Sequence, residues 1–340
     1  MAIKIRVVKK HHSGGNLSVV RPEVSLFELV QAKKHHQDGR FVNPWFQHEA
    51  PALRKILKWK ISHIREKEQA KVPIVRPNPE FLAEAEGPMV CFLGHAMVWV
   101  RLGEKSLLFD PIFGNIAGIV RRRTPPPLQP HELPPADLIL ISHAHRDHLS
   151  VQSLAMLKGK PPLVVPLKTS RYLNHDGIIE LDWFEEREIA GLRIMALPTQ
   201  HWSKRSLLDT NASLWCAYLV EADGFRLFFG GDTGYFFGFQ EIGELFGPFD
   251  LALLPSGAFL PRWLMAPFHL SPEEAVRAAL DLRAKQAMPI HWGAYRLGDE
   301  ELDDPPRLFK KAAYQAGLTP LILYPGESMS WSSPSEHTLE

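Results

Sequence analysis

Residues 137–148 read DLILISHAHRDH, an unbroken apolar run that ends in a dense group of polar side chains. Residues 137–142 have the length and apolar character of a strand that is buried on both faces of a sheet. The polar residues that follow therefore occupy the loop at the carboxyl end of that strand, where open α/β sheets place their ligand sites. This stretch predicts a layered α/β fold with a polar site at one edge of its sheet.

The histidines and the aspartate of this loop, His143, His145, Asp147 and His148, suit metal binding. Two imidazoles separated by one residue can converge on one ion, and the next aspartate and histidine can serve a second ion close by. Such donors favour zinc or a similar divalent metal over calcium or magnesium, which prefer oxygen ligands. Four such residues within six positions, directly behind an apolar strand, are improbable as chance.

Three further candidate ligands each follow an apolar run elsewhere in the chain. His201 follows LRIMALP, Asp232 lies in GGDTGY after FRLFFG, and His291 follows AMPI. Each would be an ordinary loop residue if it stood alone. Four such loops at the edge of one sheet are better explained by a shared metal site than by coincidence.

The chain divides into three predicted parts: an N-terminal extension at residues 1–88 that packs on the core, a main domain at residues 89–332, and a flexible tail at residues 333–340. Within the extension, residues 50–71 form a basic helical segment with one apolar face. We favour packing of that face on the protein's own core, and a helix lying on a membrane surface is the alternative. The apolar face consists of Leu53, Ile56, Leu57, Ile61 and Ile64.

Strands and helices alternate in the main domain. Ser271 and Glu274 form a capping box, with Pro272 at the first helical position, which predicts a helix that begins at Ser271 and ends at about residue 285. Its buried face is expected to consist of Val276, Ala279 and Leu280. Another helix is expected at residues 306–316. After the strand at residues 137–142, further strands are expected at residues 163–166, 192–198, 214–221, 225–230 and 251–255.

The composition is that of an ordinary globular protein, with 45% apolar residues, 23% charged residues and a formal net charge of +1. Nothing global therefore favours a nucleic-acid partner. Cys91 and Cys216 stand far apart in apolar stretches, which favours buried free thiols over a disulfide or a cysteine metal site. No secretory leader and no membrane-spanning run is expected, which indicates a cytoplasmic protein. The oligomeric state is not determined by the sequence.

HAHRDH resembles the His-x-His-x-Asp-His signature of the metallo-β-lactamase superfamily, and the later His, Asp and His follow in the family's order over residues 88–332. The resemblance implies a four-layer αββα sandwich with a dinuclear metal site. By the same resemblance, His143, His145 and His201 would bind one metal ion, and Asp147, His148 and His291 the other, with Asp232 bridging the two. His95 resembles a residue that orients a ligand without binding metal.

A narrower similarity, to N-acylphosphatidylethanolamine-hydrolysing phospholipase D and its bacterial relatives, extends into residues 38–88. It is carried by GRFVNPW at 39–45, LGHA at 93–96, FDPIF at 109–113, QHWSKR at 200–205, PRWLMAPFHLSPEEA at 261–275 and IHWG at 290–293. In that family a histidine matching His269 lies near the substrate phosphate. Arg146 departs from the animal enzyme, which carries an aromatic residue there, and an arginine could instead bind phosphate.

This similarity implies a phospholipase D-type phosphodiesterase that acts on N-acylphosphatidylethanolamine-like phospholipids. Its nucleophile would be a hydroxide bridging two divalent ions, most simply Zn²⁺, with Mn²⁺ or Fe²⁺ as alternatives. Asp147 and Asp232 would orient that nucleophile. His269 would contact the phosphate or protonate the leaving group, unless its role is purely structural. A lactonase acting on a sugar-phosphate lactone and a non-catalytic metal-binding protein are the competing hypotheses.

A large apolar surface is expected from residues 235–249, YFFGFQEIGELFGPF, together with Phe259, Leu260, Trp263, Leu264 and Met265. It could line a groove for an acyl chain or touch a membrane, which leaves open a peripheral contact with the inner face of the membrane. For half of these residues, packing in the core is at least as good an explanation.

Overall fold

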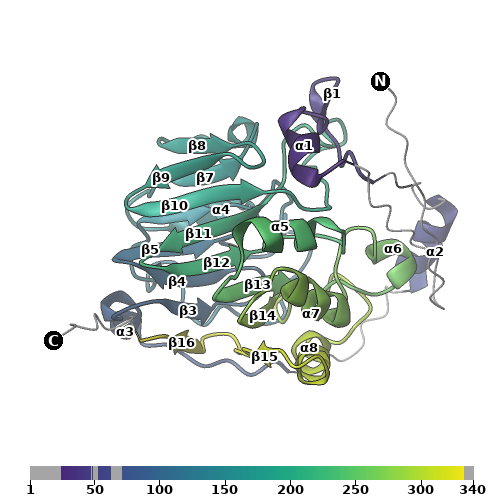
Figure 1. Cartoon of the computed structure of the whole chain (residues 1–340). Helices are drawn as coiled ribbons and strands as arrows, with labels where there is room; N and C mark the ends of the chain where they lie inside the picture. Colours follow the sequence, from purple (N-terminus) through teal and green to yellow (C-terminus); the bar gives the residue numbers. More distant parts are fainter. Residues whose placement is uncertain (1–23, 47, 49–52, 63–70, 333–340) are drawn as a thin grey trace.

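A computed structural model describes residues 24–46, 48, 53–62 and 71–332 of the chain. Two seven-stranded sheets lie face to face within the described residues (Figure 1). The first sheet has the order β16 (Ser328–Ser330), β3 (Met89–Phe92), β4 (Val98–Leu102), β5 (Lys105–Phe109), β6 (Leu138–Leu140), β7 (Leu163–Pro166) and β8 (Ile178–Leu181). The second has the order β15 (Thr319–Pro320), β14 (Gln286–Ile290), β13 (Leu251–Pro255), β12 (Phe225–Phe229), β11 (Ala217–Ala222), β10 (Leu192–Leu197) and β9 (Glu186–Ile189).

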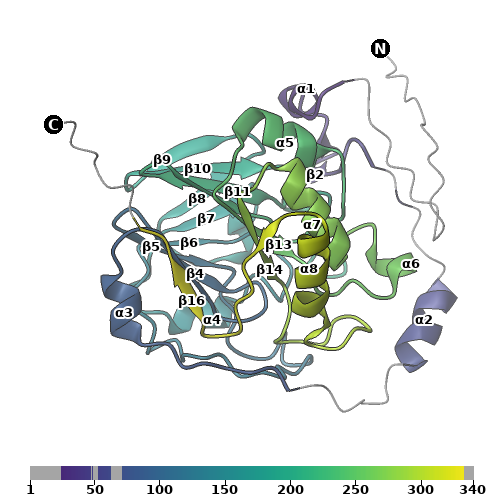
Figure 2. The same cartoon turned by 60° about the horizontal axis from the view of Figure 1, so that its bottom comes forward.

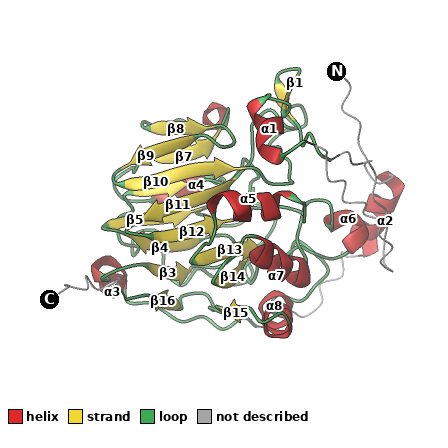
Figure 3. Cartoon of the chain, viewed as in Figure 1, coloured by secondary structure: helices red, strands yellow, loops and turns green. Residues whose placement is uncertain are grey.

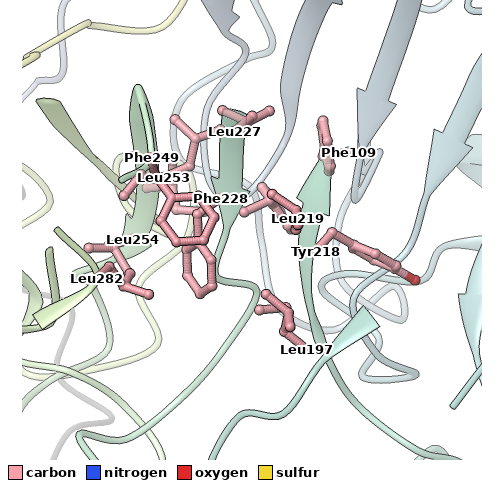
Figure 4. Close-up of a cluster of buried hydrophobic side chains, with 14 of the residues drawn as sticks. Phe109, Leu197, Tyr218, Leu219, Leu227, Phe228, Phe249, Leu253, Leu254 and Leu282 are labelled. Atoms are coloured by element: carbon pink, nitrogen blue, oxygen red, sulfur yellow. The ribbon is translucent and has the colours of Figure 1, made fainter. Parts of the chain in front are cut away.

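Both faces of the first sheet are apolar, because its strands carry buried side chains at successive positions. In β4, Val98 and Val100 point into the core between the sheets, whereas Trp99 belongs to a second core on the outer face. This alternation follows from the two-residue period of a strand. Phe109 of β5 stacks on Phe229 of β12 across the interface, with 4.5 Å between ring centroids. Figure 4 shows buried side chains on both faces of the second sheet: Phe109 and Tyr218 lie between the two sheets, whereas Phe228 packs on Phe249 and on Phe239 of the helix-covered face.

Helices cover the outer face of each sheet, which completes the expected αββα sandwich (Figure 3). The helices α5 (Gly238–Phe246), α7 (Pro272–Asp281) and α8 (Asp304–Gln315) lie on the second sheet. Leu82 of α3 (Pro79–Glu84) and Leu154 of α4 (Val151–Met156) pack on the outer side of the first sheet. Figure 2 shows α3 on the side away from α7 and α8.

The predicted helix after Ser271 is present as α7, and its capping box is formed. Val276 and Ala279 are buried as expected, but the prediction for Leu280 was wrong, because its side chain is 42% exposed. The buried arc of α7 is centred on Ala275, Ala279 and Leu282, and Leu280 lies on the outward side of it. The helix predicted at residues 306–316 is α8, which begins two residues earlier.

The N-terminal segment contacts the sandwich through polar anchors. It contains α1 (Leu26–Gln31), β1 (His36–Gln37) and β2 (Arg40–Phe41). The Glu241 carboxylate of α5 accepts the backbone N–H groups of Leu26 and Phe27 at 2.8 and 2.9 Å. Asp182, directly after β8, accepts from Lys33 and His35 at 2.6 and 2.8 Å and lies 3.0 Å from His36.

The basic helix predicted at residues 50–71 appears as α2 (Leu53–Ser62). Trp59 donates to the Asp299 carboxylate at 2.9 Å, and Lys55 Nζ lies 4.0 Å from the ring centroid of Trp263. Residues 50–52 and 63–70, and the predicted tail at residues 333–340, lie outside the described residues. The environment of the apolar stripe of this helix therefore stays a prediction.

The buried strands of the sequence analysis are present, with small changes at their ends. Residues 137–142 form a shorter strand than expected, β6, because Ser142 already turns into the loop. Cys91 and Cys216 are buried free thiols, and burial raises the pKa of each, that of Cys91 to about 12. No helix in the described part of the chain has the length and apolarity to cross a bilayer.

Candidate metal centre

The loop after β6 meets the second sheet at Ser142. The backbone N–H of Cys216 donates to the Ser142 carbonyl at 2.9 Å, and Tyr218 Oη donates to the Ile141 carbonyl at 2.8 Å. Gly231 allows this approach, because it adopts φ +55° and a Cβ atom there would lie 2.6 Å from Cβ of Ser142. Loops from both sheets therefore converge beside the first histidine of HAHRDH.

His143, His145 and His201 form one group of donors. His143 Nε2 and His201 Nε2 lie 2.8 and 3.2 Å from Nδ1 of His145. His143 and His145 follow β6, whereas His201 follows β10. The structure therefore brings His201 next to two histidines that lie more than 50 positions earlier in the sequence, and it assembles the first predicted set of ligands.

Asp147, His148 and His291 form a second group of donors. Oδ2 of Asp147 lies 3.5 Å from Nε2 of both His148 and His291. His291 comes from the loop after β14, which approaches Gly257 so closely that a Cβ atom there would lie 1.9 Å from the His291 carbonyl oxygen. The second predicted set of ligands is thus also assembled in one place.

Asp232 lies between the two groups. Its Oδ2 is 3.3 Å from Nε2 of His148 and 3.8 Å from Nε2 of His201, and its Oδ1 is 3.2 Å from Nε2 of His291. The carboxylate thus faces ligands of both groups, which is the geometry that a bridging ligand needs. His269, between α6 (Arg262–Met265) and α7, places its Nδ1 3.8 Å from Oδ2 of Asp232.

His95 is a further member of the second group, since its ligating atom lies within 4.8 Å of those of Asp147, His148 and His291. Its Nε2 is 3.3 Å from Oδ2 of Asp147. The turn that carries it is fixed by backbone bonds, from His95 N to the Trp292 carbonyl at 2.9 Å and from His291 N to the His95 carbonyl at 2.8 Å. His95 therefore braces both Asp147 and the loop of His291, which agrees with the orienting role suggested by resemblance.

Asp110 is a functional residue that the sequence analysis missed. Its buried carboxylate accepts from Ser142 Oγ at 2.6 Å and from His148 Nδ1 at 2.7 Å. Ser142 Oγ also lies 3.0 Å from Nδ1 of His143, which can therefore donate to it. These partners hold both imidazoles in the tautomer that leaves Nε2 free to bind metal. FDPIF at 109–113 contained the signal, an aspartate at the end of an apolar strand.

The electrostatics of the centre are dominated by burial and by the two carboxylates. Burial lowers the pKa of His143 and His201 well below its usual range, and that of His145 to about 4. Burial acts in the same direction on His148 and His291, but the neighbouring Asp232 and Asp147 raise the pKa of His148 and bring that of His291 to about 9. The ionised carboxylates of Asp147 and Asp232 therefore stabilise positive charge on the groups next to them.

The residues fit divalent cations by the chemistry of their donors. Within the described residues, Nε2 of His145, His148 and His291 and Oδ1 of Asp232 are buried with no hydrogen-bond partner. Buried polar atoms are rarely left unpaired, and metal ions would satisfy all four. The side chains of Asp147 and His269 are 17% exposed, against 2% or less for Asp232, His148 and His291. Solvent therefore reaches the centre on the side of Asp147 and His269.

The predicted apolar surface is mostly core. Phe236, Phe239, Ile242 and Phe249 are buried under α5, and Phe259 is buried as well. Trp263 and Leu245, 36% and 52% exposed, are the outward members. Hence this surface is smaller than the sequence suggested.

Two facing sheets, helices on both outer sides and a histidine-rich centre at their common edge define the metallo-β-lactamase fold. Residues 105–292 match the family model of the beta-lactamase superfamily domain. The chain belongs to this superfamily, and it is a metal-dependent hydrolase.

The chain is 36% identical to N-acyl-phosphatidylethanolamine-hydrolyzing phospholipase D 1 of Caenorhabditis elegans, over 83% of this chain and 79% of that protein. It is 32% identical to an uncharacterized protein of Mycobacterium tuberculosis, over 91% of this chain and 88% of that protein. The fold is similar to that of Igni18, a metallo hydrolase from Ignicoccus hospitalis, with a TM-score of 0.57 and 20% identity over 72% of this chain and 98% of that one.

Proposed function

We propose that the chain is a dinuclear phosphodiesterase of the phospholipase D type that acts on N-acylphosphatidylethanolamine-like phospholipids. The observation that carries the proposal is the position of Asp232 between two complete sets of donors, with His269 on the accessible side of the same carboxylate. The similarity to a phospholipase D of that specificity over most of both chains supports the choice of substrate.

Bound divalent cations would act as Lewis acids towards phosphate oxygens and lower the pKa of water from about 15.7 towards neutrality. The chain's own residues provide orientation. Asp147 and Asp232 offer carboxylate oxygens that can accept a proton from the attacking water. His269 Nδ1 is buried with no hydrogen-bond partner, so it is available to a phosphate oxygen or to the leaving-group oxygen.

Arg146 would contribute charge at the rim. It stands between His145 and Asp147 in the chain, its side chain is exposed, and one guanidinium nitrogen donates to the Arg205 carbonyl at 2.9 Å. The remaining N–H groups are suited to a phosphate, which arginine binds through paired hydrogen bonds.

The test is hydrolysis by the metal-loaded protein of N-acylphosphatidylethanolamine, of a sugar-phosphate lactone and of a β-lactam, with metal content measured in parallel. We expect phosphatidic acid and an N-acylethanolamine from the first substrate. In water enriched in heavy oxygen, attack at phosphorus should place the label in phosphatidic acid and not in the alcohol. Turnover of the lactone alone would replace this proposal with the lactonase, and a metal-loaded protein that hydrolyses none of the three would contradict it.

A further inference from the structure

Leu207 and Leu208 form the tip of the loop at residues 203–211, and their side chains are 88% and 86% exposed. They stand beside each other, whereas the other exposed apolar side chains of the described residues are mostly scattered singly. Scattered apolar residues on a surface need no explanation, but two adjacent leucines that remain in water forgo the stabilisation that burial would bring.

The loop presents these leucines on a fixed backbone. Oδ1 of Asp209 accepts the N–H groups of Arg205 and Ser206 at 3.0 and 2.7 Å. Asn211 N donates to the Ser203 carbonyl at 2.7 Å, which closes the base of the loop. Because hydrogen bonds hold the backbone on both sides of the tip, the leucines are displayed by the fold itself.

The same loop is bonded to the metal centre. Arg205 donates to the carbonyl of Ala144, between His143 and His145, at 2.9 Å, and Arg146 donates back to the Arg205 carbonyl at 2.9 Å. The loop also begins two residues after His201. A surface that binds the leucine tip would therefore lie next to the opening of the centre.

Cationic residues accompany this loop at its tip and at its base. Arg40, exposed on β2, donates to the Leu208 carbonyl at 3.0 Å, and Arg146 and Lys204 lie at the base of the loop. The one carboxylate of the loop, that of Asp209, accepts the N–H groups of Arg205 and Ser206 and is ionised, so the positive side chains outnumber it. Positive charge around a small apolar tip complements a layer of anionic headgroups over hydrocarbon.

We propose that Leu207 and Leu208 insert into the interfacial region of an anionic phospholipid bilayer, with Arg40, Arg146 and Lys204 against its headgroups. A stable protein interface buries about 800 Å² on each partner, far more than two side chains at a loop tip can offer, whereas a bilayer accepts a few residues. This inference rests on the proposed function, because it places the metal centre beside lipid headgroups, and it identifies the device that brings the enzyme to its substrate.

The first test is flotation of the metal-loaded protein with vesicles of phosphatidylcholine containing phosphatidylglycerol, and with phosphatidylcholine alone. We expect the double variant Leu207→Ser, Leu208→Ser to lose at least about ten-fold in vesicle partitioning. Tyr314→Ser on α8, which removes a 65% exposed aromatic side chain, is the control and should bind as the parent does. Hydrolysis of the water-soluble bis(4-nitrophenyl) phosphate should be equal in all three proteins.

The second test is insertion of a fluorescent label. The two native cysteines are buried, so an environment-sensitive thiol dye on the Leu208→Cys variant reports this position selectively. Vesicles should shift its emission to the blue, and high salt should weaken the preference for anionic vesicles. The same dye on the Tyr314→Cys variant should not respond.

The outcomes separate this inference from the proposed function. Unchanged flotation of the double leucine variant, or a loss of self-association by that variant in sedimentation experiments, would overturn the bilayer contact, the latter in favour of a second copy of the chain. Leucine-dependent vesicle binding without hydrolysis of any phosphodiester would leave the contact standing and contradict the proposed function.

Discussion

Nδ1 of His148 lies 2.7 Å from Oδ2 of Asp110, and both side chains are inaccessible to solvent. The carboxylate accepts the Nδ1–H of the imidazole, so Nε2, which lies 3.3 Å from Asp232 Oδ2, keeps a lone pair that can bind metal. Two strand ends are thereby joined, because Asp110 follows β5 and His148 follows β6. The pair explains why an aspartate that would not itself bind metal belongs to the centre.

We predict that Asp110→Asn lowers metal affinity about 10- to 100-fold, because the amide cannot accept all of the protons that the carboxylate accepts and the tautomer of His148 is no longer fixed. It should also reduce the free energy of unfolding by about 1–3 kcal/mol, the cost of a mispaired buried polar group. Competition with a chromophoric chelator and urea denaturation measure the two effects. Asp137→Asn is the matched control, at an exposed carboxylate that accepts from Ser106 N and pairs with Lys105. Equal metal affinity in both variants would refute the role of Asp110.

His143→Ala and Asp232→Ala should each abolish turnover, with losses of roughly three orders of magnitude or more, and lower the bound metal. A chelator should have the same effect on the unmodified protein and should also lower its melting temperature, because metal that binds only the folded state stabilises it. Metal analysis, the phosphodiester assay and thermal denaturation are the measurements. His131→Ala, at an exposed histidine in the proline-rich segment at residues 124–135, should change none of them. Full activity in either site variant would eliminate the proposed centre.

His269→Gln should lower kcat about 10²- to 10⁴-fold while metal content stays unchanged, if His269 acts on the phosphate or the leaving group. The alternative role is that of a metal ligand, since its nitrogen lies within 4.8 Å of the ligating atoms of Asp232 and His291. Stoichiometry separates the two: a variant that loses metal together with activity would make His269 a ligand. A variant with normal kcat would leave it only a structural role.

The His35 anchor should make the stability of the fold depend on pH. Burial lowers the pKa of this imidazole below its ordinary value, and the hydrogen bond to Asp182 only partly opposes it. The unfolded chain therefore binds the proton more readily than the folded protein does. The stabilisation that neutral His35 contributes is present above the unfolded pKa of about 6.5 and is lost as the pH falls below it. In the metal-loaded protein, His35→Gln should flatten the fall of unfolding free energy between about pH 7 and pH 5. Denaturant titrations at several pH values test this, and parallel curves for variant and parent would contradict it. His36→Gln is the control, because His36 contacts the same Asp182 carboxylate but its side chain is 33% exposed.

The proposed metal ligands could be found in the sequence because each of them lies in the loop that follows a strand. An apolar run predicts a buried strand, and a polar residue that directly follows the strand lies at the edge of the sheet, whatever the order of the strands. This pattern identified His143, His201, Asp232 and His291. The capping box at Ser271 could be predicted because it depends only on the four consecutive residues 271–274. The family signature then supplied the partition into two metal sites, which the strand pattern alone had left open.

Only the tertiary structure decided which side chains meet across long separations in the chain. The bond between Asp110 and His148, the position of His269 beside Asp232, and the anchoring of the N-terminal segment by Asp182 all join distant elements. Burial likewise depended on the assembled fold: Phe236 and Phe239 are buried in the core, whereas Leu207 and Leu208 lie in solvent although leucine is also an apolar residue. Local sequence fixes strand and helix periods and capping, but exposure and second contacts depend on how the two sheets and their loops pack together.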